Sequence, residues 1–337
     1  MKTPLKVLFL NQPNFSGHEK DQEKDGWRRI LVPQIEAYIS THELFQGRQV
    51  SIQFIHAGAS GLVSIVDTVD KKYVLKVVLR PGLSKGEAVF LKKWESVGVP
   101  VPHVYESGMI GDRAYVLMQY VDAQSLENFS EEELIDMEAF RQLGKILQNI
   151  HTTIAQGYGH MKQEGVGEYE SFRSWLLEYP HTINQLAYVQ EHTVLPVEIC
   201  GSVDRAKDIL MEYIEINPQS TYCHWDLTPG NVLHTNPLTV IDPVPTFNHP
   251  YMDVARSIVQ TIGSSFISPE AISQLLAGYF SESETLNAKV LHAAVLFICH
   301  TKAKHWHEKG KIHKIKNLQS YLFANKYLLE NKNTHNF

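Results

Sequence analysis

The strongest constraint on the fold of this 337-residue chain is a change in hydrophobic periodicity near residue 122. Before that point, short β-branched runs alternate with glycine-rich or polar turns, a pattern typical of consecutive antiparallel hairpins. The runs lie at 50–55, 62–67, 73–79, 99–108 and 114–121. A helix is expected over 84–98, with Ser84 as its cap and Gly98 as its stop. This part therefore predicts a small sheet of five strands with one helix.

From Ala123 onward, apolar residues recur at three- and four-residue steps, which indicates helices. The first expected helix covers 130–153, has three glutamates in its first turn and places Phe140, Leu143, Leu147 and Ile150 on one face. Further helices are expected at 171–178, 203–216, 251–262, 269–280, 286–307 and 314–330. The chain length and the segregated pattern favour an α+β protein of two lobes.

Three segments follow from this pattern. Residues 1–49 are expected to form a short strand, a polar loop and an amphipathic helix, which cap the smaller, antiparallel lobe. Residues 50–122 form the expected antiparallel lobe, and residues 123–337 form the expected helical lobe.

Composition excludes several protein classes. Hydrophobic residues make up 43% and charged residues 20% of the chain, which argues against a disordered or fibrous protein. Three scattered cysteines do not form a disulfide framework, so we expect a reducing, cytoplasmic environment. The longest apolar runs are too short for a signal peptide or a bilayer span, so no membrane partner is expected.

Charge is segregated along the chain. Residues 123–220 contain six lysines or arginines against sixteen aspartates or glutamates. This acidic middle argues against a nucleic-acid partner and is compatible with a cationic ligand. A set of solvated helix faces would give the same count, and it is the commoner explanation of such a segment.

The segment most informative about function is TYCHWDLTPGNVLHTNPLTVIDPVP, residues 221–245. Phosphoryl transfer from a nucleotide needs a carboxylate that orients the attacking hydroxyl and oxygen ligands that hold Mg²⁺. Asp226 fits the first role, as the catalytic base, and Asn231 and Asp242 fit the second. The five-residue spacing lets one loop present Asp226 and Asn231 together, and a short hairpin would place Asp242. His224 is expected to hold the loop by hydrogen bonds.

Two features upstream strengthen this interpretation. Lys76 lies in an expected strand and Glu87 on the next helix, an arrangement in which lysine grips nucleotide phosphates and glutamate positions it. The loop HAGASGLV could place backbone N–H groups over the phosphates, through Gly58, Ser60 and Gly61. Each feature alone has an ordinary explanation: the loop could be a hairpin turn, and the lysine could lie at a solvated strand edge. That all of these features occur by chance in the order that nucleotide binding requires is improbable.

These motifs resemble the protein-kinase-like superfamily, and within it the aminoglycoside phosphotransferase and choline-kinase-like branch. The phrases that carry the resemblance, within residues 50–262, are HWDLTPGNVL, VIDP, PYMDVARSI, LGKILQNIH and VLMQYVDAQSL. The resemblance implies a two-lobed kinase-like fold and nucleotide binding with Mg²⁺. It further implies that Asp253 is a buried carboxylate that steadies the catalytic loop, and that the backbone of Gln119 to Val121 meets the adenine.

Two details distinguish the chain from protein kinases. Only ten residues separate Asp242 from Asp253, too few for an activation segment on which a peptide docks. Trp225 stands where protein kinases have an arginine and where the small-molecule branch usually has a small residue. We therefore expect phosphorylation of a small-molecule hydroxyl, with ATP or GTP as donor.

Several alternatives for the acceptor and the function stay open. An aminoglycoside or similar amino alcohol is the first candidate acceptor, followed by choline, homoserine or a sugar. A non-catalytic nucleotide-binding module of the same fold is a third hypothesis, which the intact set of Lys76, Asp226, Asn231 and Asp242 disfavours. The sequence does not predict the oligomeric state.

Overall fold

The computed structural model describes residues 7–13, 22–55, 61–78, 86–264, 268–280 and 286–325. Its contacts divide the chain into two compact units. The first comprises Met1–Lys92 with Pro102–Asp122, and the second comprises Lys93–Val101 with Ala123–Phe337. The division falls within one helix, α2 (Gly86–Ser96).

A six-stranded sheet dominates the first unit. Its strands are β1 (Val7–Phe9), β2 (Val50–Ile55), β3 (Gly61–Thr68), β4 (Lys72–Val78), β5 (Val104–Ile110) and β6 (Arg113–Gln119), in the order β1-β2-β3-β4-β6-β5. The expected hairpins are confirmed, because β2, β3, β4, β6 and β5 pair antiparallel. The five strands expected in residues 50–122 are all present, and the short strand expected in residues 1–49 is β1, which pairs parallel with β2 and makes the sheet six-stranded.

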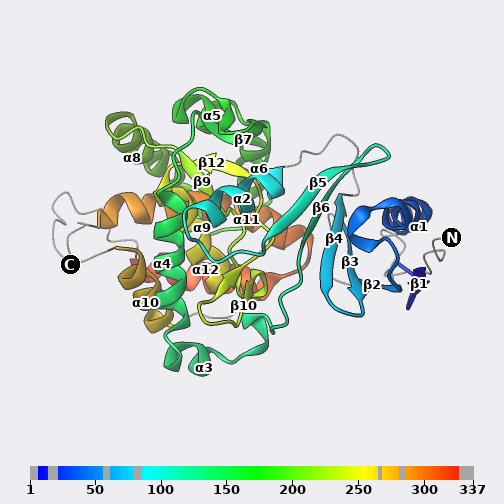
Figure 1. Cartoon of the computed structure of the whole chain (residues 1–337). Helices are drawn as coiled ribbons and strands as arrows, with labels where there is room; N and C mark the ends of the chain where they lie inside the picture. The colour runs from blue at the N-terminus through cyan, green and yellow to red at the C-terminus, as the bar shows by residue number, and fades with distance from the viewer. Residues whose placement is uncertain are drawn as a thin grey trace. The chain divides into compact units, whose positions relative to one another are not determined.

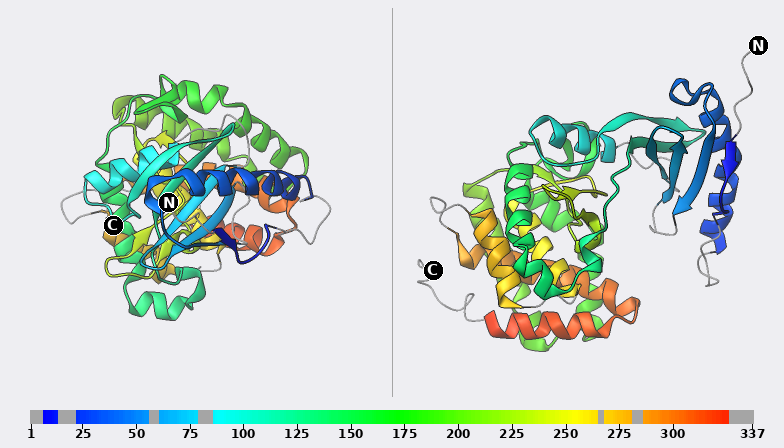
Figure 2. Two further views of the ribbon diagram at one scale, coloured as in Figure 1. Left: turned by 45° about the vertical axis from the view of Figure 1, so that its right-hand side comes forward. Right: turned by 60° about the horizontal axis from the view of Figure 1, so that its bottom comes forward.

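Helix α1 (Gln22–Thr41) covers one face of this sheet, as the left view of Figure 2 shows. Its residues Leu31, Ile35 and Ile39 recur every four positions and therefore share one face of the helix. All three are buried in a cluster that includes Ile52 and Leu75 of the sheet. A 3₁₀ turn, Glu43–Phe45, follows α1 before β2 begins.

The second unit is mainly helical, as expected. Its helices are α3 (Glu131–Asp136), α4 (Ala139–His151), α5 (Phe172–Glu178), α6 (Pro180–Glu191), α7 (Val197–Cys200), α8 (Val203–Ile216), α9 (Pro250–Gly263), α10 (Pro269–Tyr279), α11 (Ala288–Glu308) and α12 (Ile312–Asn325), with 3₁₀ turns at Leu126–Asn128 and Pro229–Asn231. The single helix expected over 130–153 was wrong. A Ser130 capping box starts α3, and Glu138, with φ +50°, separates α3 from α4.

Helices α4 and α10 lie side by side at the lower left of Figure 1. Glycines permit their close approach. A Cβ at Gly144 would lie 2.1 Å from the carbonyl oxygen of Leu275, and one at Gly278 would lie 2.0 Å from that of Arg141. The four apolar residues expected on one face of α4 are all buried.

A second, four-stranded sheet was not expected. It consists of β7 (Tyr158–Gln163), β8 (Val166–Tyr169), β9 (Thr221–Cys223) and β12 (Thr246–Asn248), in the order β8-β7-β12-β9. The pairing of Cys223 with Thr246 brings the segment after β9 close to the start of α9. The expected short hairpin is present as β10 (Val232–Leu233) and β11 (Thr239–Val240).

Helix α11 is buried over most of its length. Helix α12, the red helix in the right view of Figure 2, packs against α11 and α9. The expected extension of α12 to residue 330 lies partly outside the described residues. Within the described ranges, no helix is both long enough and apolar enough to cross a bilayer.

Candidate active site

Lys76 and Glu87 form a close ion pair in the first unit. Tyr73, Leu75 and Val77 of β4 face the core under α1, so strand alternation places Lys76 on the opposite face of the sheet. Its Nζ lies 2.7 Å from Oε2 of Glu87, in the first turn of α2. Both side chains are almost buried, 10% and 12% exposed, so solvent screens this pair little.

Gly61 is the first residue of β3, where it lies opposite Val78. A Cβ at this position would lie 3.1 Å from the carbonyl oxygen of Val77 and 3.6 Å from Cγ of Lys76. Glycine therefore keeps β3 close to the strand that carries the lysine. The predicted phosphate-loop residues Gly58 and Ser60 lie outside the described residues.

Gln119 ends β6, and Val121 follows it, half-buried. The N–H of Gln119 donates to the carbonyl oxygen of His103 at 2.8 Å, and its side-chain oxygen accepts from the N–H of His103 at 3.3 Å. The N–H of Gln119 is thus used within the protein. Any adenine contact in this segment would therefore fall to the carbonyl of Gln119 or to the backbone of Tyr120 and Val121.

In the second unit, the structure brings Asp226 and Asn231 together. The Asn231 amide donates to the backbone oxygen of Asp226 at 2.7 Å and contacts its Oδ2 at 3.4 Å. The other carboxylate oxygen, Oδ1, accepts from the amide of Gln260 on α9 at 2.7 Å. The ammonium of Lys302, on α11, lies 3.9 Å from the same Oδ1.

Three residues beside the loop were not expected from the sequence: Arg256, Gln260 and Lys302. Asp253, Arg256 and Gln260 follow one another at three- and four-residue steps, so they share one face of α9. That periodicity could have identified Arg256 and Gln260 from the position of Asp253. No motif surrounds Lys302, which comes from a helix 76 positions after Asp226.

Asp253 anchors the backbone of the loop. This fully buried carboxylate accepts hydrogen bonds from the N–H groups of His224 and Trp225, both at 2.8 Å, and from Nε2 of His151 at 3.1 Å. Burial alone would raise the pKa of Asp253. The hydrogen bonds from His151 and from the Trp225 backbone outweigh burial and lower that pKa below its ordinary value. Asp253 is therefore ionised at neutral pH.

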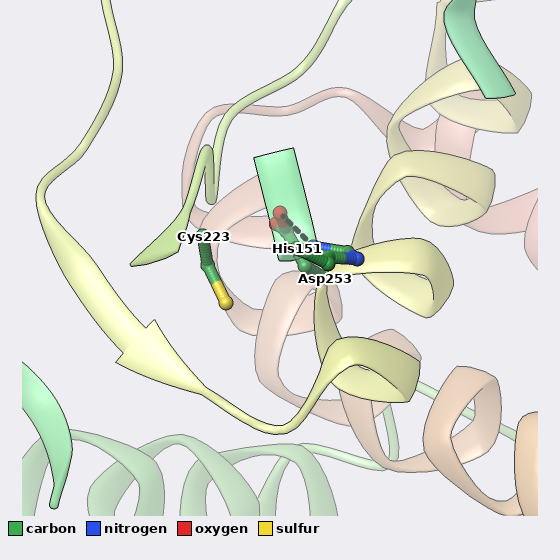
Figure 3. A group of neighbouring side chains, drawn as sticks. All are labelled: His151, Cys223 and Asp253. Carbon is green, nitrogen blue, oxygen red and sulfur yellow. Dashed lines mark hydrogen bonds and ion pairs between the residues drawn. The ribbon is translucent and has the colours of Figure 1, made fainter. Parts of the chain in front are cut away.

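His151, Cys223 and Asp253 lie next to one another, as Figure 3 shows, with potential metal-ligand atoms within 4.8 Å of one another. Their hydrogen bonds indicate a structural role rather than a metal centre. Asp253 already accepts three hydrogen bonds, and the other nitrogen of His151, Nδ1, accepts from the hydroxyl of Tyr279 at 2.7 Å. Burial also raises the pKa of the Cys223 thiol, which disfavours the thiolate that binds metals.

His224 joins the loop to the hairpin. Its Nε2 donates to the carbonyl oxygen of Ile241 at 3.0 Å, and its ring stacks on Trp94 at a centroid distance of 5.8 Å. The N–H of Ile241 in turn donates to the carbonyl oxygen of Asn231 at 3.0 Å. Burial lowers the pKa of His224, so the ring is neutral and serves as a hydrogen-bond donor to the backbone.

Trp225 and Asp242 both adopt left-handed backbone conformations, with φ of +61° and +56°. Such a conformation favours glycine, so a bulky residue at either position must be held by its surroundings. Here Trp225 is held by packing. The Arg256 guanidinium lies 4.7 Å from the centre of the indole, its Nε donates to the Trp225 carbonyl, and Trp175 contacts the indole edge-on.

Asn231 and Asp242 have the donor chemistry for a magnesium ion. The Asn231 amide nitrogen is used by Asp226, which leaves the carbonyl oxygen as its ligand atom. Asp242 supplies a carboxylate at the same open end of the β10–β11 hairpin, because Val232 pairs with Val240 and the N–H of Ile241 donates to the carbonyl oxygen of Asn231. Oxygen ligands of this kind suit Mg²⁺.

A separate hollow of about 960 Å³ in the second unit is lined by residues 154–158, 170–173, 214–215 and 217–220. Arg173 and Glu215 form an ion pair there, with Nε and Oε1 2.6 Å apart. None of the predicted site residues lines it. Glu170, which belongs to the acidic segment 123–220, lines this hollow.

Comparison with solved structures shows the kinase-like fold. The aminoglycoside phosphotransferase APH(4)-Ia matches with a TM-score of 0.59 and 21% identity, covering 82% of this chain and 93% of that one. A choline/ethanolamine kinase family protein from Mesorhizobium loti matches with a TM-score of 0.57 and 16% identity, covering 90% and 96%. The two-lobed α+β fold expected from the sequence is thereby confirmed.

Sequence comparison shows the family. A protein from Staphylococcus aureus, described as an uncharacterized protein in the ileS 3′ region, is 28% identical over 130 residues, covering 35% of this chain and 91% of that protein. The model of the phosphotransferase enzyme family (APH) matches residues 51–288, most of the chain. The protein therefore belongs to this family of phosphotransferase enzymes.

Proposed function

We propose that the enzyme transfers the γ-phosphoryl group of ATP or GTP to an acceptor hydroxyl, with Asp226 as the catalytic base. The observation that carries the proposal is the way the protein holds this carboxylate. The backbone of the loop before it is fixed by Asp253, and its two oxygens face Asn231 on one side and Gln260 on the other. A half-buried carboxylate held in this way is positioned to orient an acceptor hydroxyl.

In the proposed reaction, the acceptor oxygen bonds to the γ-phosphorus while the bond from that phosphorus to the β–γ bridging oxygen breaks. The hydroxyl proton passes to the Asp226 carboxylate, and the nucleoside diphosphate leaves. Asn231 and Asp242 would hold Mg²⁺, which supplies charge neutralisation for the phosphates when bound. Lys76, positioned by Glu87, binds the α- and β-phosphates.

The remaining predicted contacts serve the nucleotide. Gly58, Ser60 and Gly61 belong to the segment assigned to the phosphates, and Gln119 with Val121 to the segment assigned to the adenine. A thermostable mutant of APH(4)-Ia forms a ternary complex with AMP-PNP and hygromycin B, and another forms one with ADP and hygromycin B. The shared fold supports a nucleoside triphosphate as donor for this chain.

Two classes of acceptor follow from the resemblance. Aminoglycosides and amino alcohols such as choline are cationic, whereas homoserine is a zwitterion and sugars are neutral. The preference for a cationic acceptor comes from the resemblance, with the acidic segment 123–220 as a second reason. Of that segment, Glu170 lines the separate hollow. The charged side chain beside Asp226 is instead the cation Lys302. Because the chain belongs to the family of phosphotransferase enzymes that includes APH in its name, aminoglycosides are among the acceptors to be tested first.

The experiment that tests the function compares the wild type with Asp226→Asn. Mass spectrometry follows product formation from a mixed panel of aminoglycosides, choline, homoserine, sugars and hydroxy acids in the presence of Mg·ATP. Loss of a general base lowers turnover by about 100- to 10,000-fold. We expect that loss for Asp226→Asn with nucleotide binding retained, whereas Lys76→Met should weaken nucleotide binding as well.

Asp208→Asn is the matched control, because this aspartate is exposed on α8 and carries the same change of side chain. Its turnover should equal that of the wild type. Unchanged turnover in Asp226→Asn would overturn the assignment of the base.

A further inference from the structure

The two oxygens of the Asp226 carboxylate face chemically different surroundings. Oδ2 contacts the amide of Asn231, which lies on the side assigned to the metal and the nucleotide. Oδ1 faces α9 and α11, through Gln260 at 2.7 Å and Lys302 at 3.9 Å. Groups near Oδ1 are therefore placed to contact the acceptor rather than the donor.

Lys302 is an incompletely satisfied ammonium at this position. Its side chain is only 14% exposed, and its 3.9 Å ion pair with Asp226 is longer than a hydrogen bond. Over the described ranges of the chain, no hydrogen-bond acceptor lies within bonding distance of its Nζ. An ammonium has three donors, and burying it is unfavourable unless they are paired. The position is suited to an oxyanion that would complete its coordination.

The charges around Lys302 are predominantly positive. Residues 302–316 include six lysines and one glutamate, Glu308, which lies 3.8 Å from Lys304. Lys309 at the end of α11, Lys314 on α12 and Arg256 on α9 all act on Lys302 with like charge. Burial and these charges lower the pKa of Lys302 to about 7, so a bound anion would stabilise its protonated form.

Negative groups do not balance these charges. Asp226 is the carboxylate that faces Lys302, and Asp253, the other acid on this face of α9, is occupied by three hydrogen bonds. Arg256 donates to a backbone carbonyl and stacks on Trp225, so it forms no close ion pair with a carboxylate among the described residues. A polycationic acceptor would meet repulsion here, whereas an anionic one would be attracted.

We propose that the acceptor carries an anionic group, a carboxylate or a phosphate, that pairs with the ammonium of Lys302 while its hydroxyl contacts Asp226. This proposal rests on the proposed function and narrows its acceptor. Lys302 then determines substrate specificity, and Arg256 of α9 with Lys314 of α12 adds to the positive potential.

The test uses probes that share a carbon skeleton and differ in charge. Glycerate, glycerol and 3-amino-1,2-propanediol form one set, and gluconate, sorbitol and glucosamine form a larger one. Binding is measured by calorimetry on the full chain with Mg·AMP-PNP, and transfer from Mg·ATP by mass spectrometry. We expect the carboxylates to bind at least tenfold more tightly than the neutral members of each set.

Lys302→Met should abolish most of this preference. Lys316→Met, which removes an exposed lysine of α12, is the matched control and should keep it. The proposal is overturned if neutral or cationic members bind best, if no member of either set is preferred, or if Lys302→Met leaves the preference intact. An equal loss of turnover on all acceptors in Lys302→Met would assign the lysine to the transferred phosphoryl group and also overturn the proposal.

Failure of this inference is distinguishable from failure of the proposed function. Asp226-dependent transfer to a cationic or neutral alcohol would retain the function and refute the anionic acceptor. Lys302-dependent binding of carboxylates without any transfer would support the binding site and refute the function.

Discussion

Asp253→Asn is a nearly isosteric change that should uncouple the catalytic loop from α9. In the wild type, the ionised carboxylate accepts two backbone N–H groups through different oxygens, that of Trp225 on Oδ1 and that of His224 on Oδ2. An asparagine side chain has one acceptor oxygen and one donor nitrogen. Either orientation of the amide therefore leaves one buried backbone N–H facing another hydrogen-bond donor.

The magnitude follows from these contacts. A buried donor left without an acceptor costs about 1–3 kcal/mol, and replacing a charged acceptor by a neutral one weakens each remaining hydrogen bond by about 1 kcal/mol. We expect the free energy of unfolding of the second unit to fall by about 3–5 kcal/mol. For a unit of this size, the melting temperature should fall on the order of 10 °C.

The assay is thermal and urea unfolding of the full chain, followed by tryptophan fluorescence, together with turnover of the folded protein. Asp208→Asn again serves as the control for the chemical change and should unfold as the wild type does. Turnover of Asp253→Asn should fall because the backbone on either side of Trp225 is no longer held. A melting temperature within about 2 °C of the wild type would refute the view that Asp253 anchors the loop.

Two further predictions concern stability. Gly278→Ala should destabilise the second unit by about 1–3 kcal/mol, because its Cβ would lie 2.0 Å from the Arg141 carbonyl oxygen. Gly26→Ala in α1 should instead stabilise the protein by about 0.5–1 kcal/mol, because its Cβ meets nothing within 4 Å. The urea midpoints of the two variants should therefore shift in opposite directions. Burial lowers the pKa of His249 to about 3 and that of His300 to about 4, from 6.5. As the pH falls, the unfolded chain therefore takes up protons on these histidines before the folded chain does. The free energy of unfolding should be at its full value above pH 6.5, and each histidine should lower it by about 2 kcal/mol at pH 5. Urea titrations at pH 7 and pH 5 measure the loss, and a His300→Gln variant with the full pH dependence of the wild type would contradict it.

The sequence predicted the elements that depend on local pattern. Amphipathic periodicity located α4 and α8, and β-branched runs located five strands of the first sheet. The second sheet escaped because the β7–β8 hairpin has no β-branched run, and because β9 and β12 are three residues each and pair over long separations, as between Phe247 and Gly159. No local pattern marks such a pairing, since each strand gains its partner only when the helices between them are folded.

The candidate site shows the same division. The spacing of Asp226, Asn231 and Asp253 indicated a connected loop, and the structure brings these residues together, although their chemical roles stay predictions. Lys302 escaped because α11 is buried on most of its circumference, so its polar residues do not form a recognisable stripe. A functional side chain on such a helix becomes visible only when the structure shows what it faces.

The geometry of α9 explains why Lys302 is available for a ligand. One face of this helix contacts the loop through three side chains. Asp253 accepts from the N–H groups of His224 and Trp225. Arg256 donates to the Trp225 carbonyl, and Gln260 donates to the Asp226 side chain. Left-handed backbone at Trp225 costs on the order of 1–3 kcal/mol, and these contacts offset it. One helix thus positions both the backbone and the base of the loop without help from α11. Lys302 adds no hydrogen bond to that support. An ammonium beside the base, on a side chain only 14% exposed, is therefore better explained by a ligand that binds there than by a residue that it holds in place.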